Sequence, residues 1–202
     1  MKTDLKKEIA SYRAPRGSFA VVDVPPLRYL MIDGHGDPNS HVYADAISTL
    51  FAVAYRLKFM SRNEHDRDYV VMPLEALWWS DDMATFTTDR DKSRWDWTAM
   101  NLVPNWITDD QFERALAAAA DAPAIGKLRL GRLAEGRCVQ TLHLGSFDDE
   151  GPVLDVMHHE FIPGQGLRMT GRHHEVYLSD IRRTDPSKLR TILRQPVADA
   201  SA

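Results

Sequence analysis

Two glutamates stand in strand-like segments beside large aromatic residues. Glu75 lies in the segment 69–79 and Glu175 in the segment 172–180. A carboxylate in such a setting is costly to desolvate unless a ligand, a proton or a hydrogen bond compensates its charge. We therefore predict that both acids belong to a pocket, where a carboxylate can act as a general base or neutralise a cation.

Tryptophans are concentrated next to the first of these acids. The chain has five tryptophans, and four of them fall between residues 78 and 97. Strand parity puts Trp79 on the face of Glu75 and Trp78 on the opposite face, while Trp95 and Trp97 share one face. Indole rings attract cations and planar groups, so all four are candidate ligand contacts. Core packing is the alternative for each, and parity favours Trp79 over Trp78 as the residue that lines a cleft.

Two polar residues share the predicted strand face of Glu175. His173 and Tyr177 stand two residues before and after it, so all three side chains point the same way. A tyrosine hydroxyl can hydrogen-bond a carboxylate or a developing oxyanion, although a core tyrosine would show the same pattern. We take Glu75, Glu175 and Tyr177 as candidate catalytic residues and His173 as a candidate ligand-binding residue.

A His-His-Glu triplet occurs twice, at 158–160 and at 173–175. Adjacent residues of a strand or a helix point in divergent directions, so neither triplet converges on one ion. The chain also lacks the HExxH spacing of zinc hydrolases and the GxxxxGK[ST] spacing of a phosphate-binding loop. We expect no metal and no cofactor.

Length and composition fit one globular domain. The chain has 202 residues, of which 44% are apolar and 27% are charged, enough to bury a sizeable core. A net charge of -4 gives no basic surface for nucleic acid. A single cysteine, Cys138, excludes an internal disulfide, and no segment has the apolar length of a membrane span. We expect a cytoplasmic protein that uses neither nucleic acid nor membrane as a partner. The oligomeric state stays open, and a monomer is compatible with the sequence.

The first part of the chain predicts strands around one long helix. A polar, flexible segment is expected over 1–17, and a helix over 38–61 that starts after the capping residue Asp37. Runs of β-branched and aromatic residues predict the strands. These strands are expected at 19–24, 28–33, 69–79, 83–88 and 95–103, with Pro25 and Pro26 in a short turn between the first two.

The pattern then repeats after a linker helix. Capping-box spacing from Thr108 to Gln111 predicts this helix over 108–121. The later elements are two strands at 127–133 and 137–144, a helix through 153–161, a strand at 172–178 and a short turn with a final strand or helical turn at 186–194. We therefore expect pseudo-repeats at 18–104 and 127–197, with Glu75 and Glu175 at corresponding positions. The predicted fold is α+β, a single domain over 18–197 with an antiparallel sheet, two main helices on one face and a ligand cleft at the pseudo-twofold.

Three stretches carry a family resemblance, at 25–39, 71–79 and 171–183. They resemble the stand-alone GyrI-like small-molecule-binding proteins, and the similarity extends over about 18–197. The resemblance implies a duplicated strand-helix-strand-strand fold whose aromatic walls and buried glutamates bind bulky, often cationic or planar compounds. Some members of that family hydrolyse cyclopropane-bearing toxins that alkylate DNA. The matching glutamates are Glu75 and Glu175.

Three functional classes follow. In a hydrolase, one glutamate activates water for attack on the cyclopropane carbon, and a protonated carboxyl or the hydroxyl of Tyr177 stabilises the developing phenolate. We choose Glu175 as the base, although nothing in the sequence favours it over Glu75. The alternatives are a protein that sequesters cationic or planar drugs without turnover, and a ligand sensor that acts on a protein partner. The sensor is the weakest alternative, because no DNA-binding segment is evident.

Overall fold

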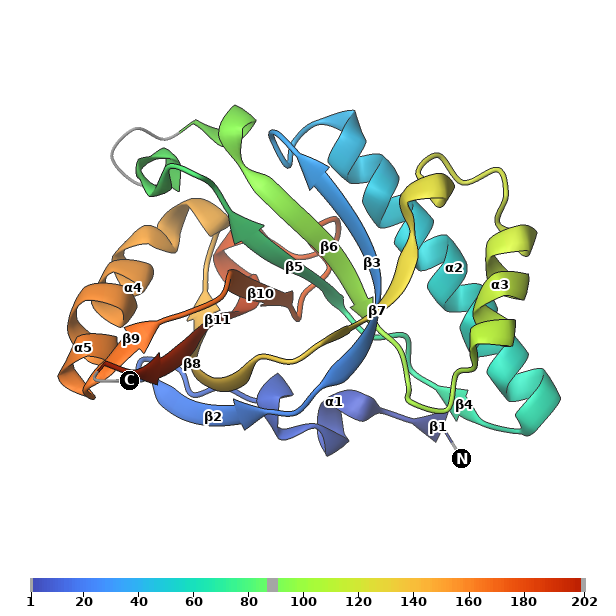
Figure 1. The fold of residues 1–202 in the computed structure, drawn as a ribbon, viewed down its shortest axis with the longest axis horizontal. Helices are drawn as coiled ribbons and strands as arrows, with labels where there is room; N and C mark the ends of the chain where they lie inside the picture. The colour runs from blue at the N-terminus through green and yellow to red at the C-terminus, as the bar shows by residue number, and fades with distance from the viewer. Residues whose placement is uncertain (1, 87–90, 201–202) are drawn as a thin grey trace. The chain divides into compact units, whose positions relative to one another are not determined.

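The computed structural model describes residues 2–86 and 91–200. The chain forms two compact units. The first unit consists of Met1–Ile9 and Leu27–Leu133, and the second of Ala10–Pro26 and Ala134–Ala202. Each unit combines a mostly antiparallel sheet with a few helices (Figure 1). The α+β class predicted from the sequence is confirmed.

The main sheet of the first unit has the strand order β5-β6-β3-β7, and every pairing in it is antiparallel. Its central strands include aromatic and branched residues such as Tyr29, Ile32 and Trp97, which fit a pleated and half-buried surface. The bounds are Leu27–His35 for β3, Leu74–Trp79 for β5, Asp96–Leu102 for β6 and Arg129–Leu133 for β7. A separate parallel pair joins β1 (Lys2–Thr3) to β4 (Asp68–Tyr69).

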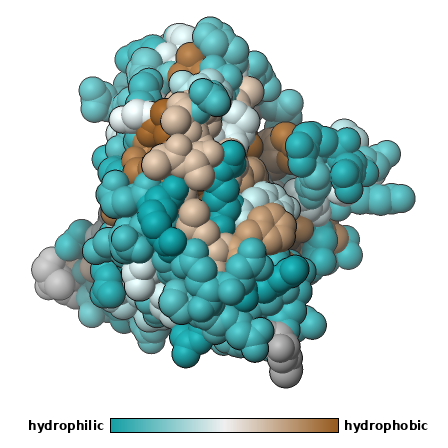
Figure 2. Space-filling model, turned by 90° about the vertical axis from the view of Figure 1, so that its right-hand side faces the viewer, coloured by the Kyte–Doolittle hydropathy of each residue, from teal (hydrophilic) through white to brown (hydrophobic). Residues whose placement is uncertain are grey.

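Two helices pack in the first unit. Helix α2 (His41–His65) buries a stripe at helical spacing that includes Leu50, Val53 and Leu57. Helix α3 (Asp109–Ala118) starts with the predicted capping box of Thr108 and Gln111 and lies beside α2 (Figure 1). The outward side of these helices is mostly hydrophilic, with a narrow apolar band (Figure 2).

The N-terminal end of α2 differs from the prediction. Ser40, not Asp37, is the capping residue, and Asp37 instead accepts hydrogen bonds from the backbone and side chain of Asn39 in the preceding turn. A short polar side chain can hydrogen-bond the backbone of a turn or of a helix end, and Asp37 does so in the turn. At the other end Asp66 adopts a left-handed conformation, with φ of 52°, and ends the helix.

The strand predicted at 83–88 is wrong for the part that the structure describes. Met83–Phe86 forms a 3₁₀ turn, and residues 87 and 88 lie outside the described residues. A second 3₁₀ turn, Lys92–Arg94, is capped by the side chain of Asp91 and leads into β6. A third, Ile125–Lys127, precedes β7.

The sheet of the second unit has the strand order β2-β8-β11-β10, again antiparallel, and β9 pairs with β11. The final segment, for which a strand or a helical turn was open, is a long strand preceded by the 3₁₀ turn Pro186–Lys188. The bounds are Ala20–Val24 for β2, Gly136–Leu144 for β8, Leu167–Met169 for β9, His173–Tyr177 for β10 and Arg190–Asp199 for β11.

The helix predicted through 153–161 is divided into three parts. A 3₁₀ turn, Phe147–Asp149, leads into α4 (Gly151–Asp155), a π-helical segment (Val156–Phe161) and α5 (Ile162–Gly164). Met157 and Ile162 of these helical segments pack on Val139 and Leu193 of the sheet. This packing defines the face of the sheet that the helices cover.

Consecutive strands do not pair as the sequence suggested. β2 and β3 follow one another, yet β2 pairs with β8 and β3 pairs with β7. The first strand of each predicted repeat is therefore in the sheet of the other unit, so the units differ from the expected repeats 18–104 and 127–197. The connection Pro25-Pro26 favours this outcome, because two prolines hold the chain extended instead of reversing it in a tight hairpin.

The N-terminal residues, expected to be flexible, form short elements. After β1 come α1 (Leu5–Glu8), capped by the side chain of Asp4, and the 3₁₀ turn Ala10–Tyr12. The carbonyl of Ser11 accepts a hydrogen bond of 2.7 Å from Nη2 of Arg194, and Tyr12 is buried. These contacts anchor residues 10–12 to the second unit.

Candidate functional site

Three predicted site residues meet on strand β10. The hydroxyl of Tyr177 donates a hydrogen bond of 2.7 Å to Oε2 of Glu175. On the other side, Nε2 of His173 lies 3.6 Å from Oε1 of Glu175. The His173 and Glu175 side chains are only 13% and 14% exposed. The strand pleat places the three side chains on one face, as parity requires.

This face of β10 is the one that the helical segments cover. Glu175 stands opposite Leu193 in the register of β10 and β11, and Leu193 belongs to the core formed with Met157. The ring of His158, from the π-helical segment, lies 6.1 Å from the ring of His173 at an angle of 80°. The helical segment therefore brings a second imidazole to the carboxylate.

The two imidazoles have buried nitrogens without hydrogen-bond partners in the described part of the chain. These atoms are Nδ1 and Nε2 of His173 and Nε2 of His158. Burial and, to a smaller extent, the neighbouring His173 lower the pKa of His158 to about 4. Buried polar atoms without partners are uncommon and mark places where a ligand or water can be bound.

Sequence reasoning missed His158. Adjacent residues of one triplet do not converge, but His158 meets His173 from a separate element. The signal in the sequence was the second His-His-Glu triplet, but the π-helical turn that directs His158 toward the sheet has no sequence signature. Such turns occur often at functional sites.

An aromatic ring closes one side of this group. Phe147 contacts Tyr177 edge to face, with ring centroids 5.5 Å apart. We call Glu175, Tyr177, His173, His158 and Phe147 the Glu175 cluster. Chemically, it offers a carboxylate held by a tyrosine, two imidazoles and an aromatic wall.

The opposite face of β10 carries a buried ionic network. Glu135 accepts a hydrogen bond of 2.9 Å from Nη1 of Arg194 and lies 2.9 Å from Nδ1 of His174, and the three side chains are at most 3% exposed. Arg194 also donates to the side chain of Gln140. Burial raises the pKa of Glu135, but His174 and Arg194 outweigh it and bring that pKa to about 2. The network fixes β10 and β11 from behind the Glu175 cluster.

Glu75 lies in the first unit and is completely buried. It stands opposite Met100 in the pairing of β5 with β6, and Trp79 stands on the same face opposite Asp96. Trp79 is partly exposed. Trp79 and Glu75 therefore share a face, as predicted.

Trp78, Trp95 and Trp97 pack on the face of this sheet that α2 covers. Tyr43 of α2 contacts Trp78 and Trp97 with ring centroids 5.6 and 4.8 Å apart. Trp95 stacks on Phe86 at 4.5 Å and donates its indole hydrogen to the carbonyl of residue 85. Their burial among these aromatic rings favours core packing for Trp78, Trp95 and Trp97. Trp79 is then the tryptophan on the face of Glu75.

Glu75 and Glu175 do not occupy corresponding positions. Glu75 is the second residue of β5, whereas the second residue of β10 is His174. Glu75 faces away from α2, while Glu175 faces the helical segments of its own unit. An offset of one residue moves a side chain to the other face of a strand, so the expected equivalence was wrong by one position.

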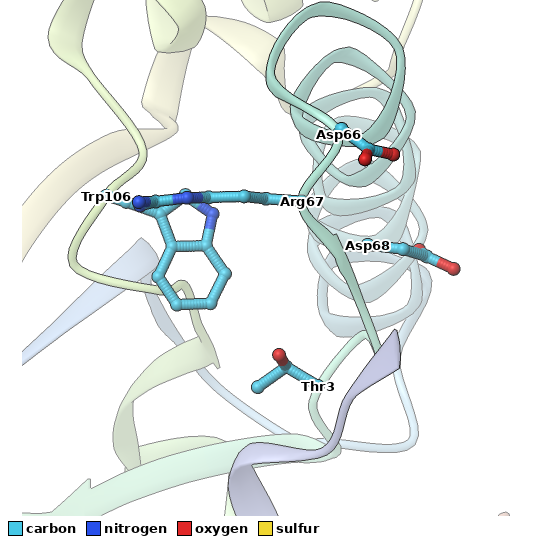
Figure 3. Close-up of a pocket in the computed structure, with 5 residues that line it drawn as sticks. All are labelled: Thr3, Asp66, Arg67, Asp68 and Trp106. Carbon is cyan, nitrogen blue, oxygen red and sulfur yellow. The ribbon is translucent and has the colours of Figure 1, made fainter. Parts of the chain in front are cut away.

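A surface pocket in the first unit is separate from these residues. It has a volume of about 170 Å³ and is lined by Thr3, Asp66, Arg67, Asp68 and Trp106. Figure 3 shows the guanidinium of Arg67 beside the indole of Trp106, whose ring centroid lies 5.6 Å away. Asp68 is paired with Lys58, and Arg67 and Trp106 supply the pocket with a cation and an indole.

Two further properties concern ions and membranes. Within residues 2–86 and 91–200, no three histidine, cysteine or acidic side chains are arranged to hold a metal ion. The helices of that part also lack the combined length and apolar character needed to span a bilayer.

Comparisons with known proteins agree with this architecture. The family model of the GyrI-like small molecule binding domain matches residues 18–198. Two crystal structures from Listeria innocua, an uncharacterized conserved protein and a hydrolase, are each 37% identical to the chain. Each alignment covers 98% of this chain and 100% of the other, with TM-scores of 0.88 and 0.83. The EcmrR C-terminal domain, 12% identical, shares the fold over 90% of this chain and 98% of that domain, with a TM-score of 0.56. No curated protein matches the chain.

Proposed function

Because the chain belongs to the GyrI-like small-molecule-binding family, we propose that its Glu175 cluster binds bulky planar or cationic hydrophobic molecules and hydrolyses electrophilic ones. Cyclopropane-bearing genotoxins are the proposed substrates. The observation that carries the proposal is the hydrogen bond from Tyr177 to Glu175 beside the unpartnered nitrogens of His173. A mostly buried carboxylate with only one oxygen engaged by a donor is suited to take a proton or to meet a positive charge.

The reaction is an addition of water. Tyr177 holds Oε2 of Glu175, which leaves Oε1 to take a proton from the water. The water oxygen attacks the methylene carbon of a cyclopropane conjugated to a dienone, and the strained carbon–carbon bond breaks. Its electrons pass into the ring and on to the carbonyl oxygen, which becomes a phenolate. The proton that Glu175 took from the water then passes through solvent to this oxygen, which gives the phenol and restores the carboxylate. A positioned general base contributes roughly 100-fold to 10,000-fold to such a step.

Glu75 and Trp79 are the proposed ligand-binding residues of the first unit. A fully buried carboxylate beside a partly exposed indole can provide charge and a flat surface for an aromatic cation. Glu75 also stays a candidate for the base.

Binding without turnover is the second candidate function. The family description itself specifies small-molecule binding, and a carboxylate among aromatic rings can neutralise a drug cation without any reaction. Only one of the two Listeria innocua proteins above is called a hydrolase. Detoxification would then occur by sequestration.

Product analysis distinguishes the two functions. The wild type, Glu175→Gln and Glu75→Gln are incubated with a spirocyclopropyl dienone toxin, and the products are identified by mass spectrometry. Glu160→Gln is the matched control, because Glu160 is an exposed glutamate on the nearby π-helical segment. A water adduct from the wild type and the control that is lost in Glu175→Gln supports hydrolysis with Glu175 as base. Intact toxin that stays bound to the wild type supports sequestration.

A further inference from the structure

His173 lies at the oxygen of Glu175 that a ligand would use. We propose that His173 determines the charge selectivity of the Glu175 cluster by competing, in its protonated form, with cationic ligands for the carboxylate. When the imidazole is neutral, Glu175 is available to a ligand cation. This inference rests on the proposed binding function and names a selectivity device within the same site.

The geometry makes the competition direct. Tyr177 occupies Oε2 of Glu175, and Nε2 of His173 lies 3.6 Å from the remaining oxygen, Oε1. A protonated imidazole at this distance forms an ion pair, and the low exposure of both side chains makes the pair stronger than one in water. A ligand cation that approaches Oε1 would meet the positive charge already there.

Among the charged and titratable groups around Glu175, His173 is the one that can act as a cation next to the carboxylate. β10 contributes Tyr177, and the π-helical segment contributes His158, whose outward neighbours are His159 and Asp155. On the same face, β11 presents the uncharged Leu193, Thr191 and Gln195. On β8, His143 stands opposite Thr191, with Nε2 3.1 Å from the carbonyl of residue 146. In the described part of the chain, no lysine or arginine is paired with Glu175.

His158 is a poor second cation beside His173. Its own protonation is disfavoured by burial and by the neighbouring His173. Protonation of His173 alone would therefore change the net charge of the cluster by one. In this proposal the cluster is negative when His173 is neutral, and it has no net charge when His173 carries a proton beside an ionised Glu175.

The consequence differs between ligands. Protonation of His173 and binding of a cation exclude one another, so the dissociation constant of a cation rises by up to about tenfold for each pH unit below the imidazole midpoint. Imidazoles gain their proton between about pH 8 and 5. An uncharged aromatic ligand of the same shape does not depend on Oε1 and keeps its affinity.

Two matched fluorescent probes test the proposal. Anthracenylmethyl-trimethylammonium carries a fixed positive charge, and anthracenemethanol is its uncharged counterpart. Titrations from pH 8 to pH 5 with the wild type are expected to weaken binding of the cation by tenfold or more and to leave the uncharged probe unchanged. In His173→Gln the cation is expected to bind with the same affinity at both pH values. His159→Gln, which changes an exposed histidine on the neighbouring segment, is expected to keep the wild-type response.

Different outcomes test the role of His173 and the binding function of the cluster. An equal pH response of the cation in His173→Gln and in the wild type overturns the role of His173. Failure of both probes to bind the wild type at pH 8 overturns the binding function proposed for this cluster, and the selectivity with it.

Discussion

The hydroxyl of Tyr177 and the carboxylate of Glu175, two residues apart on strand β10, are joined by a hydrogen bond of 2.7 Å. The bond fixes one oxygen of the carboxylate and directs the proton of the tyrosine toward Glu175. Tyr177 thus acts on Glu175 in this structure, and its proposed contribution is to position the base.

Removing this hydroxyl is expected to weaken the site without changing the fold. In Tyr177→Phe the ring still packs on Phe147, while the carboxylate loses a donor worth about 1.5–3 kcal/mol. We expect turnover or cation affinity to fall about 10- to 100-fold, measured by product formation or by fluorescence titration. An unchanged melting temperature is the control, and unchanged affinity together with unchanged turnover would contradict the positioning role.

Gly34 is required by the close approach of Trp97. A Cβ atom at residue 34 would lie 2.2 Å from the indole of Trp97, whereas at Gly126 nothing lies within 4 Å. Overpacking of a rigid core costs about 1–3 kcal/mol or more. Gly34→Ala is therefore expected to lower the free energy of unfolding, measured by urea denaturation, by about 1–3 kcal/mol or more. Gly126→Ala is expected to change it little. Equal stabilities of the two variants would contradict this account.

The buried network around Glu135 predicts a loss of stability in acid. The pKa of Glu135 is about 2 in the folded protein, below the ordinary value of 4.5, so its ionised form stabilises the fold above pH 4.5. This contribution is lost as the pH falls from about 4.5 toward 2. At pH 7, Glu135→Gln removes the carboxylate that pairs with Arg194 and His174, and breaking a buried ion pair typically costs about 3–5 kcal/mol.

The pH dependence of that difference is the measurement. Urea denaturation at pH 7, 4 and 3 is expected to show the wild type approaching the stability of Glu135→Gln as the pH falls. Glu113→Gln, at an exposed position of α3, is the control and is expected to follow the wild type. A constant difference at all three pH values would show that the charge of Glu135 does not cause it.

The two helix starts of the first unit differ in capping. The side chain of Thr108 accepts a hydrogen bond from the backbone of Gln111, whereas Ser40 caps α2 without a side-chain hydrogen bond. Thr108→Ala is expected to reduce the free energy of unfolding by about 1 kcal/mol, and Ser40→Ala by less, as measured by thermal and urea denaturation. The reverse order would contradict the observed caps.

Local patterns in the sequence determined much of the secondary structure. Helical spacing of apolar residues predicted α2, and the spacing of Thr108 and Gln111 predicted the start of α3, because both signals act within a few residues. The pleat of a strand is equally local. It grouped His173, Glu175 and Tyr177 before any tertiary contact was known.

Tertiary structure decided which strands pair and which faces the site residues occupy. Composition makes β2 and β3 strands but does not say that β2 pairs with β8 and β3 with β7, because pairing depends on contacts between residues far apart in the chain. The offset between Glu75 and Glu175 was hidden for the same reason. Strand parity tells which side chains of one strand share a face, but it does not tell which of the two faces the helix covers. His158 reaches His173 through a π-helical turn. Its place in the Glu175 cluster is set by packing of two separate elements, which no single stretch of sequence encodes.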